Sequence, residues 1–228
     1  VTSDITCFAM HALELWVCYS DGMMRVFSLS SGKVVFWKKL LSKGFVDTAL
    51  YADGRMFFAQ NVLRNDNVVA VFDVEKRVKT HDFTVSFRRT KKLVSCGFCA
   101  IWVFGTVQRR KEAVEVWERE GKFGGYSQVS MASVVGAGDK IICVEKLRGF
   151  IWVVFKTGSK MCVSIRRETD GRILKKFQLG SAVTRLAAVG KYMWGCCKDK
   201  IIIWDEKGRE LKKFSGWKND KTVRNEVE

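Results

Sequence analysis

The chain has 228 residues, of which 47% are hydrophobic and 12% aromatic, and this composition excludes an intrinsically disordered protein. Its 40 basic and 24 acidic residues give a formal net charge of +16, which favours anionic partners: nucleic acid, acidic protein surfaces or anionic lipid headgroups. No uncharged apolar run is long enough to span a membrane, so we expect no transmembrane segment. No secretory leader is visible, and the start at Val1 is compatible with a segment of a longer protein.

The first 41 residues contain four strand-like pieces, at 5–11, 13–19, 23–29 and 33–40. Asp21-Gly22 and Ser31-Gly32 separate the later pieces and are favourable hairpin turns. The second unit, 42–86, repeats the pattern with pieces at 46–51, 55–59, 68–74 and 77–85. Both units therefore predict a small antiparallel sheet of consecutive strands.

Three further units follow at 87–131, 132–180 and 181–217, and a polar tail occupies 218–228. The strand-like pieces of the third unit are 93–95, 100–107, 113–118 and 122–129. Those of the fourth are 133–147, 150–156, 160–166 and 172–179, and those of the fifth are 183–189, 192–197, 200–205 and 209–214. Helical periodicity is nowhere sustained, so the sequence predicts an all-β protein.

An aromatic residue recurs at the centre of the second piece of each unit. The five copies are spaced by 41, 45, 50 and 42 residues, and they are Trp16, Phe57, Trp102, Trp152 and Trp194. A period of about 44 residues is typical of β-propeller blades, which bury their faces by stacking on one another. We therefore predict one β-propeller domain with five four-stranded blades. The recurring aromatics, together with Trp204, are interpreted as blade core rather than as a ligand-binding row.

The third pieces end on a hydrophobic residue followed by a polar one: Phe27-Ser28, Phe72-Asp73, Trp117-Glu118, Ile165-Arg166 and Trp204-Asp205. With the run from Leu15 to Phe27, this pattern resembles divergent WD40 repeats, such as propellers attached to inositol polyphosphate 5-phosphatases and Rho exchange factors. The resemblance implies an interaction domain. The early Gly-His pair of typical WD40 repeats is missing, and WD40 rings usually have seven blades, so five copies also fit part of a larger ring.

Eight cysteines lie mostly within apolar strand-like runs, which favours a reduced, intracellular protein. We expect it in the cytoplasm rather than in the nucleus. Cys96 and Cys99 have the spacing of metal ligands, but a zinc site needs further ligands, and Cys196-Cys197 lie in a different unit. Two isolated histidines and the lack of a nucleophile-elbow motif predict no catalytic site. We expect no metal, no cofactor and no enzymatic activity.

Basic residues concentrate in three loop-like clusters, which are the candidate binding residues: Arg88, Arg89, Lys91 and Lys92; Arg109, Arg110 and Lys111; and Arg166 and Arg167. The first cluster ranks highest because it joins two units. Solvated loops without a ligand are the alternative for each cluster. Lysine pairs also recur in the last piece of three units, where they either protect an exposed sheet edge or form a basic rim: Lys38-Lys39, Lys175-Lys176 and Lys212-Lys213.

These features predict a non-catalytic scaffold for protein–protein interaction whose partners have acidic surfaces. The alternative is a propeller that binds RNA or a phosphoinositide-bearing membrane through its basic loops. The sequence leaves the partner, the pathway and the oligomeric state open.

Overall fold

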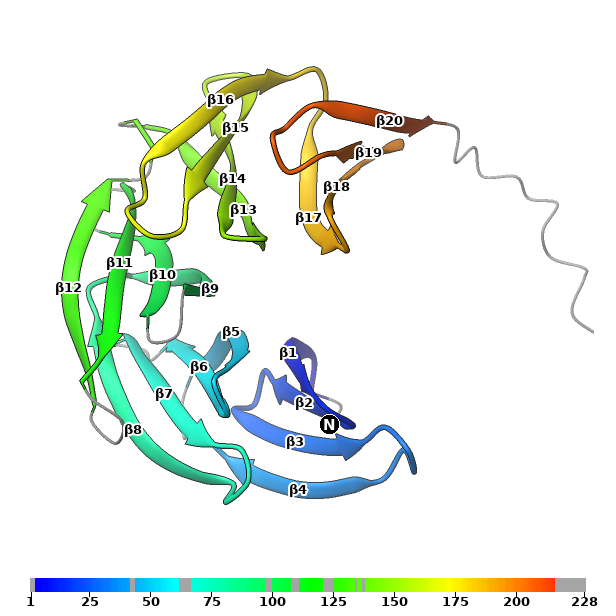
Figure 1. Cartoon of the computed structure of the whole chain (residues 1–228). Coiled ribbons are helices and arrows are strands. Elements are labelled where there is room, and N and C mark those ends of the chain that lie inside the picture. The colour runs from blue at the N-terminus through cyan, green and yellow to red at the C-terminus, as the bar shows by residue number, and fades with distance from the viewer. Residues whose placement is uncertain are drawn as a thin grey trace, which may run out of the picture. The chain divides into compact units, whose positions relative to one another are not determined.

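The computed structural model describes residues 3–41, 44–61, 67–96, 100–107, 111–120, 125–133, 135–136 and 138–215, with only the backbone of 131–133. These residues form twenty strands in five four-stranded antiparallel sheets, which confirms the predicted all-β propeller with five blades (Figure 1). The described part of the chain contains no helix that could cross a membrane. The chain divides into two compact units, Val1–Gly138 and Asp139–Glu228. The predicted polar tail lies outside the described residues.

Unit 1 contains three blades in which each strand pairs with the next one along the chain. The first blade consists of β1 (Ile5–His11), β2 (Glu14–Tyr19), β3 (Met23–Ser28) and β4 (Val34–Lys39). The second consists of β5 (Phe45–Ala52), β6 (Arg55–Asn61), β7 (Asn67–Asp73) and β8 (Val78–Val85). The third consists of β9 (Arg89–Cys96), β10 (Ala100–Thr106), β11 (Glu112–Arg119) and β12 (Tyr126–Ser133), two residues beyond the predicted boundary. Within this unit β1, β5 and β9 lie on the inner side, and β4, β8 and β12 lie outside (Figure 1).

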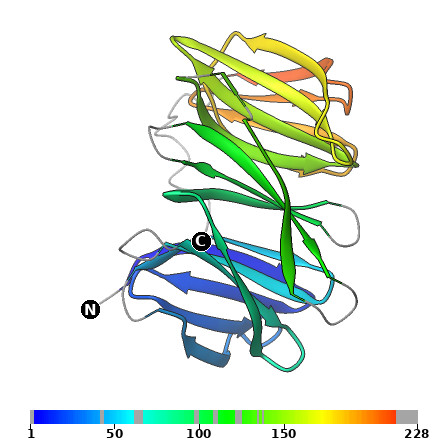
Figure 2. The same cartoon turned by 90° about the vertical axis from the view of Figure 1, so that its left-hand side faces the viewer.

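Unit 2 contains two blades of the same construction. The fourth blade consists of β13 (Lys140–Leu147), β14 (Phe150–Thr157), β15 (Lys160–Arg167) and β16 (Ile173–Leu179). The fifth consists of β17 (Val183–Val189), β18 (Tyr192–Cys197), β19 (Lys200–Trp204) and β20 (Glu210–Ser215). Figure 2 shows these two sheets, coloured light green to orange, packed face to face.

The second strand of the second blade, β6, is apolar at consecutive positions because blades cover both of its faces. On β6, Phe58 belongs to the core shared with the first blade, which includes Trp16 and Cys18. The neighbouring Phe57 belongs to the core shared with the third blade, which includes Val103. Successive side chains of a strand point to opposite faces, so a strand between two sheets needs apolar residues throughout.

Most of the recurring aromatics are core residues. Trp16 and Trp152 are 0% exposed, and Phe57, Trp102 and Trp204 are 5% exposed or less. Trp194 differs from the prediction, since it is only half-buried and lies outside the core cluster between the fourth and fifth blades.

The fifth blade fills its core from the adjacent strand instead. Trp204 on β19 packs against Trp152, with ring centroids 6.0 Å apart. Gly195 makes room for this ring, because a Cβ atom at Gly195 would lie 2.5 Å from Trp204 Cζ3. Met193 joins the same core cluster. Since Trp194 follows Met193 directly on the strand, its side chain belongs to the opposite face.

Buried carboxylates of β11 accept hydrogen bonds from within their strand and from elsewhere in unit 1. Glu115 is 0% exposed, and its Oε1 and Oε2 atoms accept hydrogen bonds from Ser86 N (2.9 Å) and Trp117 Nε1 (3.0 Å). Glu112 accepts a charged hydrogen bond of 2.5 Å from Lys91 Nζ. These bonds compensate for the loss of hydration that burying a charged group entails.

Candidate functional site

Three hairpin turns of unit 2 meet at one end of its sheets. They join β13 to β14, β17 to β18 and β19 to β20, and they contain Arg148-Gly149, Gly190-Lys191 and residues 205–209. Each blade is an antiparallel meander, so the turn between its first two strands and the turn between its last two strands emerge at the same end. The fold thereby brings together basic residues that are far apart in the sequence.

A cleft of about 330 Å³ lies between these turns. It is lined by four cationic side chains, two carboxylates, one aromatic ring and one aliphatic side chain: Arg148, Lys191, Lys207, Arg209, Asp205, Glu206, Tyr192 and Leu211. All of these residues belong to unit 2.

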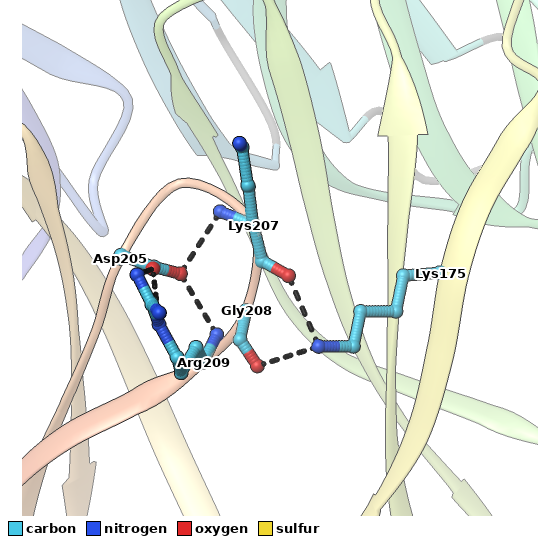
Figure 3. Close-up of polar contacts among 5 residues, drawn as sticks. All are labelled: Lys175, Asp205, Lys207, Gly208 and Arg209. Carbon is cyan, nitrogen blue, oxygen red and sulfur yellow. Dashed lines mark hydrogen bonds and ion pairs between the residues drawn. The ribbon is translucent and has the colours of Figure 1, made fainter.

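The turn between β19 and β20 is organised by Asp205 (Figure 3). Its Oδ1 atom accepts hydrogen bonds from the backbone N–H groups of Lys207 (3.1 Å) and Arg209 (2.8 Å). Its Oδ2 atom accepts a hydrogen bond from Nε of Arg209 (3.0 Å) and forms an ion pair with Nη2 of the same residue (3.0 Å). An Asp side chain that binds the backbone N–H groups following it holds a turn in one conformation. Here it also fixes the direction of the Arg209 guanidinium.

Lys175 on β16 attaches the same turn to the fourth blade. Its Nζ donates to the carbonyl oxygens of Lys207 (3.1 Å) and Gly208 (3.0 Å), as Figure 3 shows. Gly208 has a φ of 72°, and an added Cβ would lie 2.6 Å from Ile165 Cδ1. Glycine is therefore required for both the backbone conformation and the close approach. This lysine, predicted for an edge or a rim, holds the wall of the cleft.

The carboxyl group of Asp205 has a lowered pKa. Partial burial alone would raise the pKa, but the hydrogen bonds from Arg209 and Lys207 and the charge of Arg209 outweigh that effect. The Asp205 side chain is 17% exposed, whereas that of Arg209 is 77% exposed. The carboxylate is therefore a fixed internal anchor, and the guanidinium that it orients remains open to solvent.

The other two turns present Arg148 and Lys191. Arg148 and Gly149 have φ values of 48° and 80°, the pattern of a tight two-residue hairpin turn of type I′. Gly190 has a φ of 60°, and the next residue, Lys191, is exposed. The Nζ atom of Lys191 lies 5.5 Å from the centroid of the Tyr192 ring. Both cations therefore stand on short hairpins whose positions are fixed by paired strands.

Of the predicted binding residues, Arg166 and Arg167 lie beside this surface. They pair with Ile151 and Phe150, directly after the Arg148-Gly149 turn. Arg166 donates to the carbonyl oxygen of Gly171 (3.2 Å), and its burial lowers the pKa of its guanidinium. Arg167 forms an exposed ion pair of 3.2 Å with Asp170. Arg167 thus extends the basic surface, while Arg166 is held within its own hairpin.

The first-ranked cluster, 88–92, lies in unit 1, and two of its four cations form ion pairs. Arg89 Nε is 3.5 Å from the Asp47 carboxylate, and Lys91 binds Glu112. Burial raises the pKa of Asp47, and the charge of Arg89 lowers it in part. The side chain of Arg88 is exposed, Lys92 is half-buried, and Lys111 is exposed at the same end of the third blade. Arg109 and Arg110 lie outside the described residues.

The cysteines of the described chain carry free thiols, and Cys96 is buried. Its proposed partner Cys99 lies outside the described residues. Among the described residues, no group of three or more His, Cys, Asp or Glu side chains is arranged to hold a metal ion.

The first blade also exposes apolar side chains. Phe8, Met10 and Trp37 are each more than half exposed, on β1 and β4. The opposite face of this sheet packs on the core shared with the second blade, where Trp16, Met24 and other residues are 0% exposed. Exposed apolar groups gathered on one surface are common at protein interaction sites.

Comparisons with known proteins show the fold alone. No family model matches the chain, and no curated protein sequence matches it. The crystal structure of the computationally designed Ika8 protein is similar at a TM-score of 0.63 and 15% identity, over 93% of this chain. BamB from Moraxella catarrhalis is similar at a TM-score of 0.56 and 16% identity, over 88% of this chain. The chain spans 62% and 55%, respectively, of the lengths of these two structures.

Proposed function

We propose that the chain is a non-catalytic, WD40-like interaction propeller that binds an acidic segment of a protein partner at the cleft of unit 2. The observation that carries this proposal is the convergence of Arg148, Lys191 and Lys207 from three separate hairpins on one concave surface. Loops presented by a rigid β-scaffold are typical places for binding. Opposite charges of a partner would be attracted there, and the net charge of +16 would accelerate the encounter.

The distribution of acidic groups favours a protein partner over RNA or a membrane surface. Asp205 and Glu206 line the cleft itself, and Asp170 and Glu168 stand on the neighbouring hairpin. A continuous polyanion lying across this surface would meet these carboxylates, and like charges repel. A short acidic segment of a partner can place one anionic side chain against the cations of the cleft and leave the neighbouring carboxylates of this chain in solvent.

The third strands support the WD40-like assignment. Trp204 ends β19 and fills the core, and Asp205 directly after it organises the turn. Phe72-Asp73 ends β7 in the same manner, with Phe72 buried and Asp73 Oδ1 accepting a hydrogen bond of 2.8 Å from Lys76 N. Two blades therefore use an aromatic residue to fill the core and the aspartate after it to organise the turn.

We also propose an intracellular location, which agrees with the free thiols of the described cysteines.

The test compares two variants that carry the same change in charge. K191E/K207E reverses two charges in the cleft, and K156E/K160E reverses two exposed lysines at the β14–β15 end of unit 2. Proteins bound by the intact chain in a nuclease-treated extract should be lost with the first variant and retained with the second. Ligands that disappear with nuclease, or that both variants bind equally well, would contradict the proposal.

A further inference from the structure

We infer that the cleft of unit 2 recognises a phosphorylated side chain, so that the partner binds after phosphorylation. This inference rests on the proposed function and names the group that the cleft would bind. A phosphate monoester carries a charge of about −1.5 to −2 at neutral pH and offers three strong acceptor oxygens. The cleft presents cationic donors from three directions, Arg148, Lys191 and Lys207, and Arg209 stands beside them.

The balance of charge in the cleft suits a dianion better than a single carboxylate. Asp205 is occupied by Arg209 and by two backbone N–H groups, so that pair contributes little net charge. Arg148, Lys191 and Lys207 then exceed the one remaining lining carboxylate, Glu206, by two charges. A phosphate dianion would neutralise this excess, whereas a carboxylate would neutralise half of it.

The size of the cleft and its apolar walls fit an anion carried on a side chain. About 330 Å³ is at the lower end of small-ligand pockets and exceeds the volume of one phosphoryl group. Tyr192 and Leu211 supply apolar wall beside the cations. A phosphorylated side chain can therefore place its oxygens on the basic groups and its carbon atoms against these two residues.

Arg209 and the backbone of the turn that carries Lys207 are held in position before a ligand binds. Arg209 is fixed by Asp205, with Nε and Nη2 engaged, and it can still donate from Nη1. The turn carrying Lys207 is held by Lys175 and by the packing of Gly208 on the fourth blade. Donors that are already ordered lose less entropy on binding, so charge-assisted hydrogen bonds to phosphate retain more of their strength.

The first experiment separates this inference from the proposed function. An extract is divided, one half is treated with phosphatase, and proteins are captured with the intact chain, K191E/K207E and K156E/K160E. We expect capture by the intact chain and by K156E/K160E to fall at least about tenfold after phosphatase. Capture that depends on Lys191 and Lys207 but survives phosphatase would overturn the inference and leave the proposed function standing. Capture that does not depend on these lysines would overturn both.

The second experiment uses defined probes. N-acetyl-O-phosphoserine amide and N-acetyl-aspartate amide are titrated into the isotope-labelled chain, and the amide signals of 190–192 and 205–209 are followed. We expect shifts with the phosphorylated probe at several-fold lower concentration, and weakening as the pH falls below about 6, where the phosphate gains a proton. Histidine is absent from the described lining, so this pH range reports on the probe. Equal binding of the two probes, or tighter binding of an RNA oligonucleotide or phosphoinositide vesicles through the same residues, would overturn the inference.

Discussion

Replacement of Asp205 by alanine should loosen the turn that forms one wall of the cleft. The substitution removes two hydrogen bonds to backbone N–H groups, at 3.1 and 2.8 Å, and the contacts to the Arg209 guanidinium. Each backbone bond contributes about 0.5–1.5 kcal/mol, and the ion pair adds less than about 1 kcal/mol because Arg209 is 77% exposed. We expect a loss of about 2 kcal/mol in unfolding free energy and a decrease in Tm of about 4–8 °C.

Asp205→Asn is the matched comparison, because its amide oxygen can still accept the two backbone hydrogen bonds but carries no charge. It should cost about half as much as the alanine variant. Thermal unfolding followed by tryptophan fluorescence gives the global effect, and hydrogen exchange of the amides of 206–209 gives the local one. Unchanged exchange in the alanine variant, or an equal loss in both variants, would refute the role assigned to the carboxylate.

The lowered pKa of Asp205 makes its contribution depend on pH. The folded state favours the ionised carboxyl, so the stabilisation is complete above the ordinary aspartate pKa of about 3.9 and is lost as the pH falls through the lower folded value. The asparagine variant lacks this titration. Its stability difference from the intact chain should therefore shrink between pH 5 and about pH 2, as measured by denaturant unfolding, and a constant difference would contradict the assignment.

Two further substitutions, each with a control, and the reactivity of one cysteine test the packing. Gly195→Ala should cost about 1–3 kcal/mol because its Cβ would lie 2.5 Å from a tryptophan ring, whereas Gly180→Ala, with nothing within 4 Å, should change the unfolding free energy by less than about 0.5 kcal/mol. Glu115→Ala should cost about 1–3 kcal/mol by leaving the buried Trp117 Nε1 donor unpaired and removing the partner of Ser86 N, and the exposed Glu118→Ala serves as its control in the same denaturant titration. Cys18 should resist alkylation until the chain unfolds, because a hydrogen bond with the Cys7 thiol and burial raise its pKa; rapid labelling under native conditions, read by mass spectrometry, would contradict this.

The strand pattern was predictable because each blade repeats the same physical problem. A second strand between two sheets must be apolar on both faces, and hairpin turns need residues that tolerate positive φ, such as Asp53-Gly54. The repeat of the central aromatic therefore predicts the number of blades in the chain. Trp194 shows the limit of that reasoning. In the fifth blade Trp204 fills the core in place of Trp194, because Gly195 leaves room for its ring. This replacement depends on three-dimensional packing.

The cleft was only partly predictable from the sequence. Arg166-Arg167 forms a run of charge in the sequence, whereas Arg148, Lys191 and Lys207 are single cations in separate turns. A useful indication was present, since each of the three adjoins a glycine in a hairpin turn. The meander topology places such turns at one end of neighbouring blades. Charge runs such as 88–92 are, by contrast, partly neutralised by carboxylates from other strands, Asp47 and Glu112.

The most direct test of the proposed binding surface is amide hydrogen exchange of the intact chain, measured with and without its captured partner. If the partner binds at the cleft, we expect slower exchange in the complex at 190–192 and 205–209. The K191E/K207E variant should show no such protection at these segments under the same conditions. Protection confined to unit 1, around 88–92 and Lys111 or on β1 and β4, would contradict the assignment of binding to the cleft of unit 2.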